Sequence, residues 1–419
     1  MRSLTEMLVF FSVASTGWAL VHFGLYRGLR HAFPEKKRKP FIAALFVGFS
    51  LAPLSMLLAR TSVATRVVET FSRIAFIEAG FVSLIFILLV LRWLGSLLAR
   101  PFASKVKTAR RDFLRRASDL AIALTALVIG GTGIATAMRE PQIIRVPIRL
   151  PRLGEPFRGY RIVQLSDFHI GPAFREEGVR LVVDKVNALK PDLVVITGDL
   201  IDGYVHELRP HVAPLADLKA RDGVYFATGN HEYYWGGEEW IRHLEELGIP
   251  TLRNEARLIE RDGDGLIIAG CTDYRMGRSI KGDASDPQKA LEGLPRALPR
   301  ILLAHQPQSV YQAAEAGYDL QLSGHTHGGQ FFPFTWLIHL VQPFVAGLDR
   351  HGDTQLYVNR GTGFWGPAMR HGGEGEITEI LLDKLEEEAV VRSEGLEEDA
   401  SPGPNLRPES VRAHAMKEV

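Results

Sequence analysis

Two histidines stand one residue apart in the stretch LSGHTHGGQ, which occupies residues 322–330. His325 and His327 follow an apolar run and lie between glycines, and the side-chain alternation of a strand end would send both imidazoles to the same side. Imidazole nitrogen is a common ligand of transition metals. The stretch therefore predicts either a pair of metal ligands or a polar turn. The other polar blocks of the chain decide between these two interpretations.

Four further polar blocks follow apolar runs earlier in the chain. They are D-x-H at 167–169, GD at 198–199, GNHE at 229–232 and an isolated histidine at 305. A single block of this kind is typical of a turn at the end of a strand. A whole series of them, each after an apolar run, is hard to explain by packing alone and indicates one shared site. The candidate residues are Asp167, His169, Asp199, Asn230, His231, His305, His325 and His327.

The composition limits the chemistry of such a site. The chain of 419 residues has one cysteine, Cys271, which excludes an internal disulfide and a cysteine-ligated zinc site. A metal would have to bind His, Asp, Asn or Glu, and this mixture of ligands suits Mn²⁺, Fe or Zn²⁺ without choosing among them. The formal net charge of +1 gives no electrostatic reason to expect nucleic acid as a partner.

Short runs rich in β-branched residues alternate with helix-like patterns in the last two-thirds of the chain. The strand-like runs lie at 161–171, 192–203, 223–234, 265–274, 300–307 and 318–329. Helix-like patterns separate several of them, as at 176–190 and 237–248. Buried strands that alternate with helices predict an α/β domain of sheets covered by helices, over about residues 141–385, with its site at the strand ends.

Taken together, the polar blocks resemble those of the calcineurin-like metallophosphoesterases, and among them the membrane-associated bacterial phosphoesterases that end in GHTHGGQ. The resemblance covers about residues 158–383. It implies a two-sheet β-sandwich flanked by helices, with two divalent metal ions bound by loops at one edge. The ligands that it implies are Asp167, His169 and His327 for the first metal, Asn230, His305 and His325 for the second, and Asp199 as the bridge.

The resemblance also implies a reaction. Two cations about 3.5–4 Å apart need an anionic bridge, and the Asp199 carboxylate can supply it. A metal-bound hydroxide attacks phosphorus, while His231 contacts the phosphate and protonates the leaving oxygen. We therefore expect a hydrolase of a phosphomonoester, a phosphodiester or a pyrophosphate. Sites with the same ligands act on many substrates, lipid- and envelope-linked esters among them, so the motifs do not choose one.

The first third of the chain is expected to lie in a membrane. Apolar stretches of about the length of a span occur at 6–26, 41–59, 76–98 and 119–138. We therefore predict a multi-pass transmembrane region with four helices over residues 1–140. Lysine and arginine number six in 27–40 and seven in 100–118, but three in 60–75. Because basic loops stay on the cytoplasmic side, the following domain is expected on the extracytoplasmic face of the cell membrane.

Two features flank the predicted α/β domain. The heptapeptide ARRDFLR at 109–115 resembles the twin-arginine export consensus. The resemblance implies that this machinery exports a folded domain. The alternative is that these are ordinary basic residues before a membrane span. Small residues at 135–137 match a cleavage pattern, but we expect the segment to be retained as an anchor. Residues 386–419 are charged and aperiodic, and we predict a disordered tail.

Several residues near the polar blocks are candidates for supporting roles. Asp202 and Glu232 are expected to orient ligands. Arg370, in the segment 359–372, is expected to meet a phosphate. The aromatic run FFPFTWLIHLVQPF at 331–344 is expected to be either core, or a loop over the site or against the bilayer that binds an apolar substrate.

Two other functions fit the same sequence. One is a lipid-precursor pyrophosphatase whose domain faces the cytoplasm. The other is a non-catalytic membrane sensor with a metal-stabilised domain. The complete set of ligands together with His231 favours an enzyme, because a purely structural metal needs neither an open pair of ions nor an acid.

Overall fold

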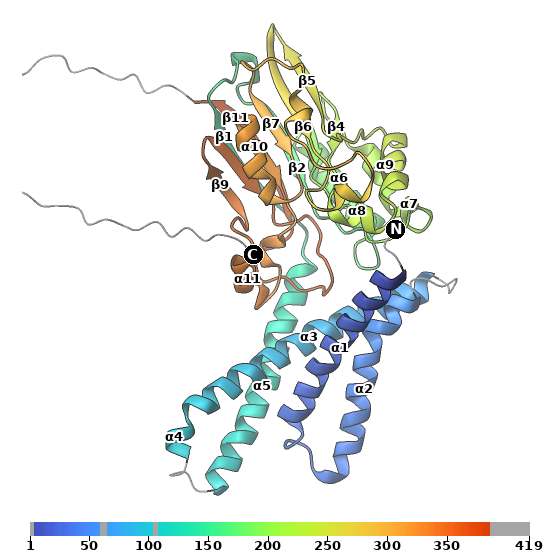
Figure 1. The fold of residues 1–419 in the computed structure, drawn as a ribbon, viewed down its shortest axis with the longest axis vertical. Coiled ribbons are helices and arrows are strands. Elements are labelled where there is room, and N and C mark those ends of the chain that lie inside the picture. Colours follow the sequence, from blue (N-terminus) through green and yellow to red (C-terminus); the bar gives the residue numbers. More distant parts are fainter. Residues whose placement is uncertain (1–3, 59–64, 104–107, 386–419) are drawn as a thin grey trace, which may run out of the picture. The chain divides into compact units, whose positions relative to one another are not determined.

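The computed structural model describes residues 4–58, 65–103 and 108–385. The tail that we predict to be disordered, at 386–419, lies outside this part of the chain. A helical region comes first (Figure 1) and consists of α1 (Leu4–Leu29), α2 (Glu35–Leu58), α3 (Thr65–Leu98), α4 (Arg100–Ala103) and α5 (Thr108–Ala137). Strand β1 (Gln142–Leu150) follows it directly and begins the sheets.

Two helices of this region, and not the predicted four, are long and apolar enough to cross a membrane among the described residues. They are α3, over Thr70–Leu98, and α5. Polar and small residues such as Ser15 and His22 interrupt α1, and α2 begins with the basic run EKKRK and contains two prolines. The prediction of four spans was therefore wrong for the part of the chain that the structure describes, where only α3 and α5 meet the requirements of length and apolarity.

The long helices pack against one another. Leu25 of α1, Val82 and Leu89 of α3 and Ile122 of α5 form one buried apolar cluster. The two candidate spans therefore belong to a helical bundle, in which α1 contributes side chains although its described part is not apolar enough to count as a span.

Two mixed sheets form the larger part of the described chain (Figure 1). The five-stranded sheet has the order β1-β11-β2-β3-β4, and the six-stranded sheet has the order β5-β6-β7-β8-β10-β9. Besides β1, the first contains β2 (Arg161–Leu165), β3 (Leu193–Ile196), β4 (Val224–Phe226) and β11 (Glu376–Lys384). The second contains β5 (Glu255–Arg261), β6 (Asp264–Gly270), β7 (Arg300–Leu303), β8 (Leu320–Ser323), β9 (Gly347–His351) and β10 (Thr354–Val358). The expected α/β class with two sheets is confirmed.

Apolar side chains from both sheets meet in one core. Ile162 and Val195 of the first sheet and Ile301 and Leu322 of the second belong to the same fully buried cluster. Helices cover the outer faces: α6 (Glu176–Ala188), α7 (Val205–Val212) and α9 (Gly237–Glu246) pack on the first sheet, and α10 (Val310–Ala316) packs on the second. Because both faces of the central strands are buried, these strands are nearly continuous apolar runs, as in LVVI of β3.

Parallel strands bring the candidate residues to one edge of the sandwich. β2 pairs in parallel with β3, β3 with β4, and β7 with β8. Ile196 at the end of β3 pairs with both Leu165 of β2 and Phe226 of β4, so the three strands end level with one another. Loops that leave the carboxyl ends of neighbouring parallel strands converge, and this is where such folds place their sites.

Candidate metal centre

The candidate residues lie in loops directly after five of the parallel strands. Asp167 and His169 follow β2, Asp199 follows β3, Asn230 and His231 open α8 (Asn230–Tyr234) after β4, His305 follows β7, and His325 and His327 follow β8. The fold therefore brings together residues that are up to 160 positions apart, counted from Asp167 to His327.

Strained backbone accompanies most of these positions. Left-handed backbone, which is rare outside glycine, occurs at Asp167 (φ 51°), His169 (φ 50°), Asp199 (φ 51°), His325 (φ 73°) and His327 (φ 52°). Each such residue costs about 1–3 kcal/mol and persists only where the surrounding structure determines it. Clustering of this strain in the loops of one edge is typical of a functional site.

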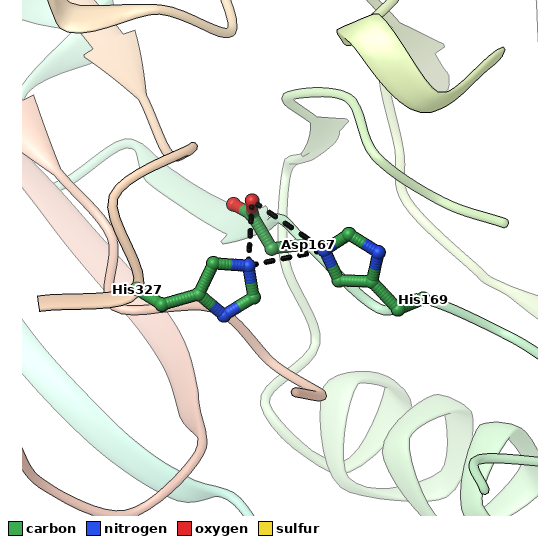
Figure 2. Close-up of side chains that lie close together, drawn as sticks. All are labelled: Asp167, His169 and His327. Atoms are coloured by element: carbon green, nitrogen blue, oxygen red, sulfur yellow. Dashed lines mark hydrogen bonds and ion pairs between the residues drawn. The ribbon is translucent and has the colours of Figure 1, made fainter. Parts of the chain in front are cut away.

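Asp167, His169 and His327 form a first group of possible ligands (Figure 2). The Nε2 atoms of His169 and His327 are 3.0 Å apart. The Oδ1 atom of Asp167 lies 3.3 Å from His327 Nε2 and 4.0 Å from His169 Nε2. All three residues are buried, so the three atoms face one small space that a single cation can fill.

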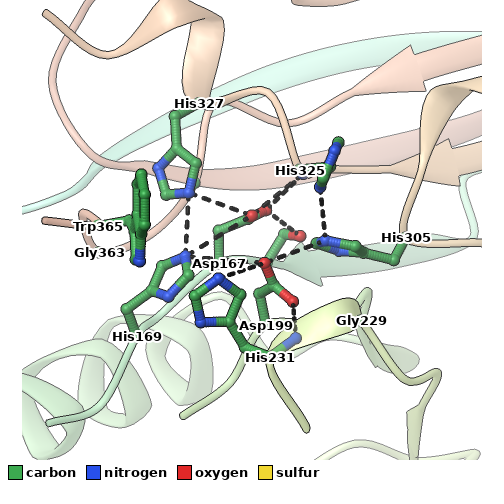
Figure 3. A network of polar contacts seen from close by, with 12 residues as sticks. Asp167, His169, Asp199, Gly229, His231, His305, His325, His327, Gly363 and Trp365 are labelled. Carbon is green, nitrogen blue, oxygen red and sulfur yellow. Dashed lines mark hydrogen bonds and ion pairs between the residues drawn. The ribbon is translucent and has the colours of Figure 1, made fainter. Parts of the chain in front are cut away.

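Asp199, His305 and His325 form a second group beside the first (Figure 3). His305 Nε2 is 3.1 Å from Asp199 Oδ2 and 3.2 Å from His325 Nδ1. The same Oδ2 atom of Asp199 is 3.9 Å from His169 Nε2 of the first group. The Asp199 carboxylate thus lies between the two groups, where a bridging ligand is required.

Two further contacts fit the binding of metal at these groups. His305 Nδ1 donates a hydrogen bond of 2.8 Å to the carbonyl of Thr197, which leaves the lone pair of Nε2 directed at the centre. Asn230 Oδ1 is buried and accepts no hydrogen bond. Buried amide oxygens rarely lack a partner, and a cation would satisfy this one. The buried His/Asp clusters are thus consistent with a binuclear metal site.

Two glycines make room for the carboxylates. A Cβ atom at Gly324 would lie 2.0 Å from Asp167 Oδ2, and one at Gly229 would lie 2.2 Å from Asp199 Oδ1. Both distances are far below any van der Waals contact, so a larger residue would have to displace the carboxylate. The glycines of GHTH and GNHE are therefore required by close packing at the site.

We predict that Gly324→Ala reduces the number of bound metal ions while the fold is retained, because the new methyl group displaces the Asp167 carboxylate. The measurement is metal content per chain by mass spectrometry together with the thermal unfolding midpoint. Gly237→Ala is the matched control, since its Cβ would meet nothing closer than 3.5 Å. Full metal content in Gly324→Ala would show that Asp167 is not held where the site needs it.

Comparison with known proteins identifies the family. The family model of the calcineurin-like phosphoesterases matches residues 160–329. A Danio rerio protein, described as a transmembrane protein with metallophosphoesterase domain, is 41% identical over 314 residues, which cover 72% of this chain and 71% of that protein. The chain belongs to the calcineurin-like metallophosphoesterase family. An uncharacterized metallophosphoesterase of Helicobacter pylori is also similar, with 35% identity over 276 residues that cover 65% of this chain and 72% of that protein.

A second bacterial relative matches over nearly its whole length. It is the uncharacterized metallophosphoesterase YkuE of Bacillus subtilis, with 33% identity over 289 residues that cover 66% of this chain and 98% of that protein. The family match and the buried His/Asp ligand groups together identify a metal-dependent phosphoesterase.

Asp202 contacts two histidines of the metallophosphoesterase site, with a hydrogen bond to His231 and an ion-pair contact to His169. Its Oδ1 atom is 2.5 Å from His231 Nδ1, and its Oδ2 atom is 3.2 Å from His169 Nδ1. A carboxylate on Nδ1 fixes both the tautomer and the orientation of an imidazole, so that Nε2 faces the centre. His231 Nε2 accordingly lies 3.8 Å from Asp199 Oδ2.

Glu232 ties together the two loops that carry Asp199 and Asn230. Its buried carboxylate accepts hydrogen bonds from the backbone N–H groups of Asp199 (3.1 Å), Leu200 (2.8 Å) and Gly229 (2.7 Å). The last residue of the GNHE block therefore orients the backbone around the site and does not point its oxygens at the metal groups.

The carboxylates favour positive charge in their surroundings. Burial alone would lower the pKa of His231, but Asp199 and Asp202 raise it to about 9. Burial alone would raise the pKa of Asp199, but the neighbouring His305 and His231 hold it well below its usual range. Such a strongly polarised buried cluster is an electrostatic environment suited to divalent cations.

The sequence prediction did not include an aromatic wall beside His231. The Trp365 ring lies edge-on to the His231 ring, with their centroids 5.9 Å apart, and the Tyr234 ring lies 5.2 Å from the His231 ring. Gln330 fixes Trp365, because its Oε1 accepts from the Trp365 N–H at 2.9 Å and its Nε2 donates to the Trp365 carbonyl at 2.7 Å. Gln330 is the last residue of GHTHGGQ, and it is the part of the predicted motif that points to the contact between Trp365 and His231.

Arg370 does not have the position that we expected for a phosphate contact. Its guanidinium is buried and donates hydrogen bonds of 2.9 Å to the carbonyls of Arg360 and Gly361, and another to Gly363. Burial lowers its pKa to about 10. Carbonyl groups of an irregular loop have no partner in a strand or helix. Arg370 donates to such carbonyls and so stabilises the loop that contains them.

Proposed function

We propose that this chain is a membrane-anchored hydrolase that cleaves a phosphate ester with two divalent cations and His231. The observation that carries the proposal is the position of Asp199, whose Oδ2 atom lies 3.1 Å from His305 of one ligand group and 3.9 Å from His169 of the other. A carboxylate between two groups of metal-binding side chains is the arrangement that a binuclear centre requires.

In this proposal each group of ligands holds one cation. Asp167, His169 and His327 bind the first, Asn230, His305 and His325 bind the second, and Asp199 bridges them. The support is the set of distances and the unpartnered oxygen of Asn230 described above. Mn²⁺, Fe and Zn²⁺ all suit this donor set. When bound, the cations would activate water and neutralise charge on the phosphoryl oxygens.

His231 is the proposed proton donor to the leaving oxygen. Asp202 holds its Nδ1 atom, so the Nε2 atom faces the bridging carboxylate across 3.8 Å, a gap that is too long for a direct hydrogen bond. An oxygen of a bound phosphate ester placed against Nε2 would receive its proton. Phosphomonoesters, phosphodiesters and pyrophosphates all have a leaving oxygen that can occupy this place.

The catalytic domain is proposed to face the extracytoplasmic side. Residues 100–118, which run from the end of α3 into the first turns of α5, carry seven Lys and Arg, which are expected to stay in the cytoplasm. The domain after α5 then lies on the opposite side. Arg110 and Arg111 fall in the first turns of α5, and their role as a twin-arginine signal stays a prediction.

A reporter pair fused after residue 419 tests this orientation. We expect alkaline phosphatase, which needs an oxidising compartment, to be active there and a cytoplasmic reporter to be silent. The control is the same pair fused after residue 103, in the basic loop, where the opposite result is expected. Cytoplasmic activity after residue 419 would instead support the cytoplasm-facing pyrophosphatase.

Hydrolysis of matched chromogenic esters tests the function itself. The full chain is purified in detergent and given p-nitrophenyl phosphate or bis(p-nitrophenyl) phosphate with Mn²⁺, Zn²⁺ or Mg²⁺ in turn. We expect turnover that depends on the metal, and the preferred ester would separate monoesterase from diesterase. A folded, metal-loaded chain that hydrolyses neither ester, nor a pyrophosphate, would favour the non-catalytic sensor.

A further inference from the structure

Large apolar side chains are exposed on one short segment after the metal site. The helix α11 (Phe334–Leu337), the 3-10 helix η7 (Ile338–Leu340) and Val341 directly after η7 carry them. Trp336 is 71% exposed, Leu340 81% and Val341 68%, and Phe334 and Leu337 are close to half exposed. We refer to these five residues as the apolar patch. An exposed patch of this kind marks a contact with a membrane or another apolar partner.

The segment that carries the apolar patch is attached to the two candidate spans. Phe331 and Phe332 pack against the buried side chains of Leu84 in α3 and Ala126 in α5, together with Met369. The Phe332 ring contacts the Trp336 ring edge-on, with centroids 5.1 Å apart. The patch therefore continues an apolar surface that begins on α3 and α5.

Hydrogen bonds reinforce this attachment. His371 Nε2 donates to the carbonyl of Ile129 in α5 at 2.7 Å, and His371 Nδ1 accepts from the N–H of Phe332 at 3.2 Å. The N–H of Arg370 donates to the carbonyl of Gly133 at 2.9 Å. Close approach is possible because Gly133 has no side chain, since a Cβ there would lie 2.5 Å from the His371 ring.

The length of α5 sets the depth of these contacts. Its charged residues end at Asp119, and the apolar part from 120 to 137 is about 27 Å long at a rise of about 1.5 Å per residue. The hydrocarbon core of a bilayer is about 30 Å thick, so all of this part is needed to cross it. Ala126 and Ile129 then lie within the core, and the segment packed against them meets lipid.

The same segment is joined to the catalytic site. It begins in the loop of His327, and the side chain of Gln330 pairs with the backbone of Trp365. Trp365 is 53% exposed, and its ring lies edge-on to the His231 ring. The segment that carries the patch is thus joined, through Gln330 and Trp365, to the side of the site where the leaving group is proposed to lie.

We propose that the apolar patch inserts into the bilayer leaflet next to the catalytic domain and that the substrate is a lipid-linked phosphate ester taken from this leaflet. The acyl part of the substrate would stay in the bilayer while its phosphate reaches the metal site. The substrate class rests on the proposed hydrolase function, whereas the insertion of the patch does not.

Site-specific quenching tests the insertion. The full chain carrying Leu340→Cys, labelled with an environment-sensitive fluorophore, is reconstituted in phosphatidylcholine vesicles that contain spin-labelled lipid. Cys271 is buried and should remain unlabelled. Leu348→Cys, at a half-exposed leucine of β9, is the matched control. We expect quenching at position 340 and none at position 348. Equal fluorescence at both positions, with and without spin label, would overturn the insertion.

Turnover of lipid and soluble esters tests the substrate class. The lipid probes are dioleoyl phosphatidic acid, a monoester, and dioleoyl phosphatidylglycerol, a diester, in phosphatidylcholine vesicles. The soluble probes are the p-nitrophenyl esters. We expect the double variant Trp336→Ser, Leu340→Ser to lower kcat/KM for the preferred lipid about tenfold and to leave the soluble esters unchanged, because two apolar anchors leave the bilayer. Leu258→Ser, at another exposed leucine, should change neither.

The outcomes separate the two proposals. Equal losses on lipid and soluble esters would overturn the role of the apolar patch. Hydrolysis of soluble esters by the unmodified chain with none of the lipids would overturn the lipid substrate and leave the hydrolase intact. Hydrolysis of no ester at all by a metal-loaded chain would overturn the hydrolase, and the quenching result would then stand alone.

Discussion

Asp199→Asn is expected to lower metal-dependent phosphoester hydrolysis by at least about a hundredfold and to reduce the metal content of the chain. The substitution is nearly isosteric, but it removes the negative charge between the two ligand groups. Two divalent cations repel each other strongly at short distance, and a neutral amide does not offset that repulsion. The carboxylate also lies 3.1 Å from His305 and 3.8 Å from His231, so its charge affects both.

The measurements are kcat/KM with p-nitrophenyl phosphate and metal content per chain over a range of metal concentrations. The fold should survive, because the backbone N–H of His231 donates to Asp199 Oδ1 at 2.9 Å and an amide oxygen can still accept that bond. Asp353→Asn, at an exposed turn, is the matched control for charge. Undiminished activity with two bound ions in Asp199→Asn would contradict the bridging role.

The convergence of the metal-binding residues could be predicted from the sequence. Asp167, Asp199 and His305 each follow a run of apolar residues too short for a helix and too apolar for an exposed strand. Such runs are central strands, and polar residues at their ends can only meet at the edge of the sheet. The spacing within GHTH also predicts that the imidazoles of His325 and His327 extend from one loop toward the same site.

The exact partners of those residues could not be predicted, because they depend on which loops become neighbours. Asp202 was expected to orient ligands, but nothing in the sequence indicates that it contacts both His169 and His231, since the three residues come from separate loops. Trp365 reaches His231 only because Gln330 holds it there. Arg370 was assigned to a phosphate from the kind of segment that contains it, but burial among backbone carbonyls decided its role.

The order of the strands in the sheets could not be predicted from the sequence pattern either. β11 is the last strand among the described residues, and it lies between β1 and β2, antiparallel to β2 and parallel to β1. Glu376–Lys384 was not among the predicted strands, and its run of apolar residues does not specify which strands it pairs with. Only the packing of Ile380 and Leu382 into the core between the sheets fixes that place.

His231→Ala is expected to lower hydrolysis to an extent that depends on the leaving group. Asp202 holds the His231 ring so that Nε2 faces the site, where it can donate a proton to the departing oxygen. General acid catalysis of this kind contributes about 10²–10⁴-fold. The full loss should appear with an alkyl phosphate, whose alkoxide is a poor leaving group. p-Nitrophenolate leaves readily without a proton, so the loss with p-nitrophenyl phosphate should be much smaller.

The comparison is therefore made within one enzyme and between two esters. kcat is measured for the unmodified chain and for His231→Ala with a phenyl ester series of rising leaving-group pKa, ending in an alkyl ester. The slope of log kcat against that pKa should become steeper in the variant, because the unprotonated oxygen now carries the developing charge. His243→Ala, at a buried histidine of α9 outside the metal groups, is the control and should keep the original slope. Parallel slopes with a uniform loss would show that His231 only positions the substrate.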